Sequence, residues 1–161
     1  MATILGRDNL KKTTKDIIEK SFPLLKHKKL YLYTTKSKKY VGGATKLPFI
    51  NVIRINKKLL NDNQYLIGVL SHELSHLERF TKMGWIKYFF VGISYWINGS
   101  ARTKEEMEVN KLSIRKGYAK ELYYAMVKNE QNPYAKKIRK YYMTPSEIKS
   151  YAIKIKKWQQ F

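Results

Sequence analysis

The chain has 161 residues, of which 43% are hydrophobic and 14% aromatic, and it contains no cysteine. This length and composition predict one globular domain over residues 1–161 and exclude an intrinsically disordered chain. Disulfides, thiolate metal sites and cysteine nucleophiles are excluded as well. The formal charge of +21 favours polyanionic partners such as nucleic acid or an anionic membrane surface, although a solvated surface is the simpler interpretation of any single lysine cluster.

The N-terminal third predicts one helix followed by three strands. Residues 8–21 place apolar side chains among lysines at helical spacing. Residues 1–20 contain no apolar run long enough for a signal peptide, so we expect a cytoplasmic protein. Residues 30–35 and 49–55 are rich in strand formers. Gly42-Gly43 predicts a turn or bulge, and Pro48 favours a sheet edge. We expect the three strands to be antiparallel.

A second helix is predicted to begin near Asn61, because Asn61 can cap it and Gln64 completes a capping-box pattern. Two neighbouring stripes follow at helical spacing, one of leucines suited to a core and one that carries both histidines of this region. Their members are Leu66, Leu70, Leu74 and Leu77 in the first stripe, and Tyr65, Val69, His72 and His76 in the second.

Residues 84–97 form the most apolar stretch, which is shorter than the roughly 20 residues of a membrane-spanning helix. We interpret it as a buried helix. The alternative is an aromatic-rich segment in a membrane interface, which would make the protein peripheral to the membrane. Residues 104–129 predict one long helix, and Thr144-Pro145-Ser146-Glu147 predicts the start of the last one. Apolar side chains between residues 148 and 158 form a face that is either docked on the core or offered to a partner.

Residues 71–76 read Ser-His-Glu-Leu-Ser-His, the pattern of a zinc-binding helix. His72 and His76 lie one turn apart and can hold one ion, while Glu73 beside them can take a proton from the attacking water. The chain has only 3 histidines and two fall in this pattern, so chance is a poor explanation. A closed structural site is less favoured because such sites use four ligands, mostly thiolates.

The third zinc ligand is predicted to be a carboxylate, because no histidine follows the motif and His27 lies in a lysine cluster. Glu105, Glu106 and Glu108 open the next long helix. We choose Glu106, because it shares a stripe of polar and small residues with Asn110, which could hydrogen-bond a ligating imidazole. We expect Glu105 and Glu108 to be ordinary surface charges.

Residues 69–77, followed by Glu106-Met107-Glu108-Val109-Asn110, resemble the gluzincin zinc metallopeptidases. The resemblance is closest to the soluble minimal gluzincins, or minigluzincins, which are similar to the catalytic domains of membrane-embedded CaaX-protease and heat-shock peptidases. Those relatives have Glu-x-x-Ala-Asp where this chain has Val109 and Asn110; the Glu-x-x-Ala-Asn of ImmA-type repressor-cleaving peptidases is also similar. Upstream, residues 43–45 and 51–60 are similar to the edge strand and the following strand of the family, so the resemblance covers residues 30–125.

The resemblance implies an α+β fold and a zinc-dependent peptidase. The fold would have a sheet of about three strands, an active-site helix, a glutamate-bearing second helix and additional N- and C-terminal helices. Extended peptide or protein substrate would pair with the edge strand. A tyrosine would support the oxyanion, but the sequence selects none of its 13. The implied residues are His72, His76 and Glu106 as zinc ligands, Glu73 as general base, Asn110 behind the ligands, and Gly43, Ala44 and Thr45 as the substrate-binding edge.

An alternative function is a basic protein that binds nucleic acid or an anionic membrane and has a latent or non-catalytic zinc site. Tyr141 and Tyr142 beside basic residues, and Trp158 beside lysines, have the pattern of stacking sites for bases. A protease of the SprT-like class, acting at DNA, is less favoured because its third ligand is a histidine. The C-terminal region from Asn132 onward is a candidate to cover the site in a latent form.

Overall fold

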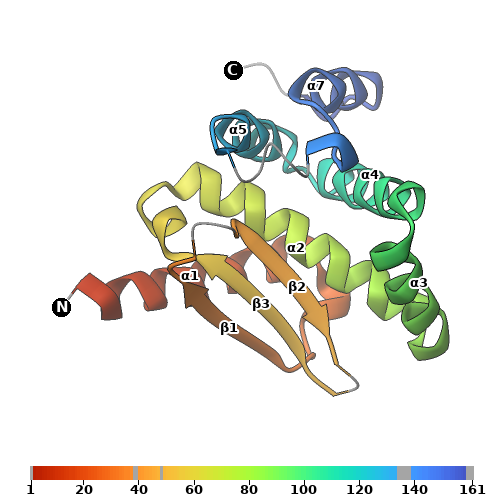
Figure 1. The fold of residues 1–161 in the computed structure, drawn as a ribbon. Coiled ribbons are helices and arrows are strands. Elements are labelled where there is room, and N and C mark those ends of the chain that lie inside the picture. Colours follow the sequence, from red (N-terminus) through yellow and green to blue (C-terminus); the bar gives the residue numbers. More distant parts are fainter. Residues whose placement is uncertain (1, 38–39, 48, 134–138, 159–161) are drawn as a thin grey trace.

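The computed structural model describes residues 2–37, 40–47, 49–133 and 139–158 (Figure 1). Six α-helices and a three-stranded sheet make up this part of the chain, so the predicted α+β fold class is confirmed. Helix α2 (Asn63–Met83) runs through the middle of the molecule. It packs against the sheet and against α1 (Ala2–Ser21), and on another side against the C-terminal helices.

The sheet is mixed rather than antiparallel. Strand β1 (Leu30–Thr35) is parallel to β3 (Asn51–Asn56), and β2 (Gly42–Lys46) is antiparallel to β3, in the order β1-β3-β2. The prediction of an all-antiparallel sheet is therefore wrong for the β1–β3 pair. Strand β3 lies in the centre and is the most buried of the three strands, with Ile53 and Ile55 fully buried.

Gly42 and Gly43 do not form the predicted turn or bulge, because they are the first two residues of β2. Gly42 lets this strand approach α2 closely. A Cβ atom added to Gly42 would lie 2.6 Å from Val69 Cγ1 and 2.9 Å from Glu73 Oε1. The next strand begins at Asn51 rather than at Phe49. Pro48, on which the sheet-edge prediction depended, lies outside the described residues.

The cap of α2 is Asp62, one residue later than predicted. Its carboxylate accepts a hydrogen bond of 3.0 Å from the backbone N–H of Tyr65. Asn61 ends a short 3₁₀ helix, Lys57–Asn61, which occupies the residue predicted as the cap. All four leucines of the predicted stripe are fully buried and join side chains of α1 and β3 in one hydrophobic cluster.

The single helix predicted over residues 104–129 is two helices, α4 (Gly99–Arg115) and α5 (Ala119–Glu130). The break falls at Gly117, which has a φ of +99°. The N–H groups of Gly117 and Tyr118 bond back to Ile114 and Ser113, which is the hydrogen-bond pattern of a Schellman cap.

Helices α2 and α5 touch through their backbones at Gly68. A Cβ atom added to Gly68 would lie 2.1 Å from the carbonyl oxygen of Glu121 in α5. Glycine is therefore the one residue that permits this crossing. As a result, α5 packs on α2 one turn before His72, on the same face of the helix.

Helix α3 (Trp85–Ile97) is not the buried helix that we predicted. None of its described side chains is buried, and Ile97 is 80% exposed. Among the described residues, no helix has the length and apolar character that crossing a membrane requires.

Helix α7 (Pro145–Lys154) begins with the predicted capping box. The Thr144 hydroxyl accepts a hydrogen bond from the Glu147 N–H, and the Glu147 carboxylate accepts one from the Thr144 N–H. Ile148 and Ala152 are fully buried in a second hydrophobic cluster shared with α4 and α5. The apolar face of this helix is therefore docked on the core rather than offered to a partner.

Candidate metal centre

His72 and His76 project from one face of α2 and meet a carboxylate from α4. Their ring centroids are 4.9 Å apart. Glu106 Oε2 lies 3.2 Å from His72 Nε2 and 3.4 Å from His76 Nε2. One ligand-type atom from each of these buried residues lies within 4.8 Å of the other two. The structure thus brings together the three residues that the sequence predicts as zinc ligands.

Small polar side chains let α4 lie close to α2 at this point. Ser71 Oγ and Ser113 Oγ are 2.8 Å apart across the helix contact. Asn110, one turn after Glu106, is fully buried, and its Oδ1 accepts a hydrogen bond of 2.8 Å from His72 Nδ1. A proton on Nδ1 leaves the lone pair of His72 Nε2 directed at Glu106, which is the tautomer that a metal ligand needs.

The ligand-type atoms of this cluster face one another. In the tautomer that a metal ligand needs, with the His72 proton on Nδ1 and donated to Asn110, His72 Nε2 and Glu106 Oε2 would be two acceptors 3.2 Å apart. Glu106 Oε2 and His76 Nδ1 are buried without a hydrogen-bond partner. A cation would remove the repulsion between the acceptors, and two imidazole nitrogens with one carboxylate oxygen match a catalytic zinc site. The residues therefore fit a zinc ion.

Glu106 is held ionised and oriented by its neighbours. Burial acts to raise the pKa of Glu106, but the imidazoles of His76 and His72 outweigh it and hold the pKa well below the usual range. Tyr95 of α3 donates its hydroxyl proton to the second carboxylate oxygen, Oε1. Burial and the charge of Glu106 raise the pKa of the Tyr95 phenol, so it remains a donor. These contacts leave Oε2 directed at the histidines.

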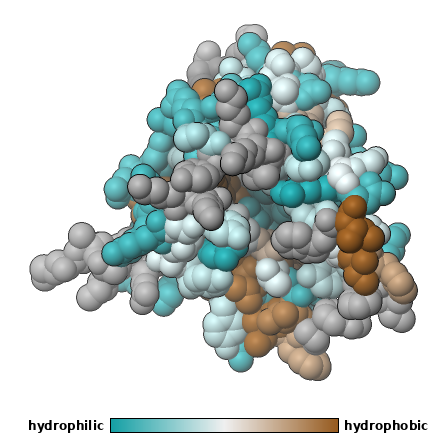
Figure 2. Space-filling model, in the orientation of Figure 1, coloured by the Kyte–Doolittle hydropathy of each residue, from teal (hydrophilic) through white to brown (hydrophobic). Residues whose placement is uncertain are grey.

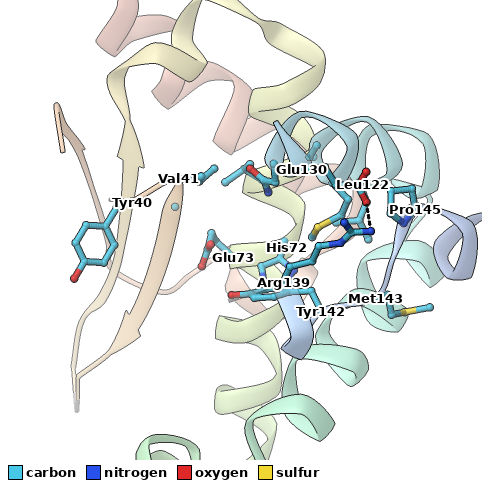
Figure 3. Close-up of a pocket in the computed structure, with 16 residues that line it drawn as sticks. Tyr40, Val41, His72, Glu73, Leu122, Glu130, Arg139, Tyr142, Met143 and Pro145 are labelled. Carbon is cyan, nitrogen blue, oxygen red and sulfur yellow. Dashed lines mark ion pairs between the residues drawn. The ribbon is translucent and has the colours of Figure 1, made fainter. Parts of the chain in front are cut away.

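Glu73 lies on α2 beside the histidines and points toward the cavity in Figure 3. Burial is the main cause that raises its pKa to about 7, and the charge of Glu106 adds to it. His72, Arg54 and a hydrogen bond from the backbone N–H of Ala44 act in the opposite direction. A dication bound at the neighbouring histidines would lower this pKa further. Glu73 therefore has the environment of a general base that works near neutral pH.

Strand β2 is an edge strand of the sheet and runs along α2, the helix that carries Glu73 (Figure 1). Gly43, Ala44 and Thr45, which the sequence predicts as the substrate-binding edge, all lie in this strand. The N–H of Ala44 bonds to Glu73, so this part of the strand edge is turned toward α2. The structure therefore places the predicted edge beside the predicted base.

A cavity of about 110 Å³ opens beside His72 and Glu73, between β2, α2, α5 and the segment that precedes α7 (Figure 3). An ion pair of 2.6 Å between Arg139 and Glu130 lies at its wall. Since a cavity of about 150 Å³ holds a benzene molecule, this one suits a single apolar side chain. The apolar part of its lining includes Val41, Val69, Leu122, Ala125, Met126 and Met143.

Tyr95, Tyr142 and Arg102 also lie at the metal centre, and sequence reasoning did not select them. The Tyr142 ring packs on His72, with 5.7 Å between ring centroids, and burial raises its pKa well above the usual value. Arg102 donates a hydrogen bond to the Tyr142 hydroxyl. No pattern marks the two tyrosines, which reach the site from other elements. Arg102 lies one helical turn before Glu106, and this spacing is the signal that could have identified it.

The two other carboxylates that the sequence offers at this point of α4 are paired with basic side chains. Glu105 is buried and accepts two hydrogen bonds from Arg79, of 2.9 and 2.8 Å, so its prediction as a surface charge is wrong. Glu108 is partly exposed and pairs with Lys111 at 2.9 Å, in keeping with a surface role. These pairings leave Glu106 as the carboxylate of α4 that faces the histidines.

The aromatic side chains that the sequence suggested as stacking sites for bases contact other parts of the protein. Tyr142 packs on His72, and the ring centroid of Trp158 is 5.5 Å from that of Tyr123. The Arg102 guanidinium lies 4.5 Å from the ring centroid of Tyr141. These contacts reduce the aromatic surface that could stack with nucleic-acid bases.

Comparison with protein-family models, with characterised proteins and with solved structures finds no match to this chain. The gluzincin resemblance therefore depends on the motif residues and on their arrangement around the metal centre.

Proposed function

We propose that this protein is a zinc-dependent peptidase that hydrolyses peptide bonds of an extended substrate. The observation that carries the proposal is the convergence of His72, His76 and Glu106 beside the buried carboxylate of Glu73. Zinc bound by these three residues would supply a Lewis acid that polarises the scissile carbonyl and lowers the pKa of water.

The chain's own residues would move the protons of the reaction. Glu73 takes a proton from the attacking water and passes it to the leaving amine. Tyr142 accepts a hydrogen bond from Arg102 through its phenol oxygen, so its own proton remains free to be donated. We assign to Tyr142 the stabilisation of the negative charge that develops on the carbonyl oxygen. Asn110 keeps His72 in the ligating tautomer.

Strand β2 and the neighbouring cavity would bind the substrate. A peptide in extended conformation adds to the free edge of β2 and pairs with it backbone to backbone. One apolar side chain of the peptide then enters the cavity of about 110 Å³ beside Glu73. We therefore expect a preference for substrates with an apolar residue next to the scissile bond.

Metal content and hydrolysis together test the proposal. Wild type is expected to hold stoichiometric zinc after dialysis and to degrade an unfolded protein. His76→Ala and Glu106→Ala should lose the zinc, whereas Glu73→Gln should keep the zinc and lose the activity. Full zinc in both ligand variants would overturn the site assignment.

The basic binding protein with a non-catalytic zinc site predicts a different pattern. In that case wild type and Glu73→Gln retain zinc equally and are equally inactive toward unfolded protein.

A further inference from the structure

Helix α3 presents apolar side chains to solvent on the face away from the metal centre. Phe90, Ile93 and Ile97 are 63%, 44% and 80% exposed and fall at i, i+3 and i+7, so they form one stripe. On the opposite face, Tyr95 donates to Glu106, and Tyr88 packs on Phe80 with 4.7 Å between ring centroids. The inner face thus fixes the helix and turns the apolar stripe outward.

The end of the β2–β3 hairpin adds further apolar surface next to α3. Leu47 and Phe49, between the two strands, are 47% and 89% exposed. Lys46 Nζ donates a hydrogen bond of 3.0 Å to the carbonyl of Phe80, the residue on which Tyr88 of α3 packs. Figure 2 shows hydrophobic surface both over α3 and over the lower end of the hairpin.

The charges carried by these two elements are all positive. No Asp or Glu occurs between Glu19 and Asp62, the stretch that contains the whole sheet. None occurs between Glu78 and Glu105, the stretch that contains α3. The apolar surface therefore belongs to the part of the chain in which lysines and arginines are not balanced by carboxylates.

We propose that α3 and the end of the β2–β3 hairpin form a membrane-binding surface that docks the protein on an anionic lipid bilayer. Exposed apolar side chains in a part of the chain whose charges are all positive are what such a surface needs, because the apolar side chains insert among acyl chains and the positive charges attract the headgroups. Nucleic acid fits less well, since Ile93 and Ile97 offer it neither charge nor a stacking plane.

Docking of this kind would place the metal centre near the bilayer. Tyr95 connects the inner face of α3 to Glu106. Only this helix, about 10 Å in diameter, would therefore separate the metal centre from the lipid. Peptide segments that emerge from a membrane would then be the nearest substrates. This consequence rests on the proposed peptidase function, whereas the binding surface itself does not.

Co-sedimentation with vesicles tests the surface. Vesicles of phosphatidylcholine with roughly 30% phosphatidylglycerol should bind wild type, more weakly as salt rises, and pure phosphatidylcholine should bind little. The double variant Phe49→Ser/Ile97→Ser removes the most exposed side chain of each element and should reduce partitioning by about tenfold or more. The matched control is Ile153→Ser on α7, whose side chain is 55% exposed, and it should bind like wild type.

Three outcomes would overturn the proposal. One is a wild type that does not bind the phosphatidylglycerol vesicles. Another is a double variant that binds them as well as wild type does. The third is that the apolar surface is buried between two copies of the chain. In that case wild type is a dimer that does not bind vesicles, and the double variant is a monomer. Zinc content and hydrolysis of a soluble peptide should be unchanged in the double variant, which separates this test from that of the peptidase.

Discussion

The glycine at the start of β2 offers a direct test of how Glu73 is positioned. Gly42→Ala adds one methyl group where the strand passes over α2. The added Cβ would lie 2.6 Å from Val69 Cγ1 and 2.9 Å from Glu73 Oε1. Because carbon atoms in contact are about 3.5–4.0 Å apart, the strand or the two side chains must move by about 1 Å.

A displacement of this size is large for a catalytic carboxylate. Misplacement of a reacting group by about 1 Å can cost about 100-fold in rate, and we expect kcat to fall by about that factor. Overpacking of a core site costs about 1–3 kcal/mol, so the variant should remain folded but melt at a lower temperature. The zinc content should not change, because the atoms nearest to the added methyl group belong to Val69 and Glu73 and not to a predicted ligand.

The neighbouring glycine provides the matched control. A Cβ atom added to Gly43 would lie 3.6 Å from Arg54 Nη2, an ordinary contact. Gly43→Ala should therefore keep kcat within about twofold of wild type. It should also be slightly more stable, because alanine restricts the conformations open to the unfolded chain. The assay is hydrolysis of an unfolded protein, with zinc content and melting temperature measured on the same samples. Equal activity of the two alanine variants would refute the claim that Gly42 sets the position of Glu73.

Further variants test the hydrogen bond that orients His72, the Arg79–Glu105 ion pair and a helix cap. Asn110→Ala should weaken zinc binding by about 10- to 100-fold in a competition assay with a chelator, whereas Asn110→Asp keeps an oxygen acceptor and should retain the metal. Glu105→Ala leaves Arg79 without its bidentate partner and should lower the free energy of unfolding by about 2 kcal/mol in urea; an unchanged midpoint would contradict this. Thr144→Ala should cost about 1 kcal/mol and Thr144→Ser much less, and equal losses would mean that the hydroxyl does not stabilise α7.

Local patterns in the sequence predicted the parts of the site that depend on helical spacing. His72 and His76 share a face because they are four residues apart, and Glu106 and Asn110 share a face for the same reason. The absence of later histidines and of cysteines pointed to a carboxylate as the third ligand. The structure brings all four side chains together.

Features that depend on tertiary packing were not predictable in this way. The order of the strands depends on which strand pairs on both of its edges. Strand β3 does so, between β1 and β2, and its pairing with β1 is parallel. Gly117 lies inside the single helix predicted over residues 104–129, and only its positive φ reveals a helix end. Tyr142 comes from a distant segment and packs on His72, and no spacing rule connects the two.

The contact at Gly68 has a consequence for how the cavity beside His72 can vary among related chains. The wall formed by α5 is held at backbone distance from α2, since even an alanine would bring Cβ to 2.1 Å from the Glu121 carbonyl oxygen. Main-chain atoms therefore set how far α5 lies from α2, while side chains such as Met126 can change the depth of the cavity. A glycine four residues before the first histidine should accompany the motif wherever this close crossing of the two helices recurs.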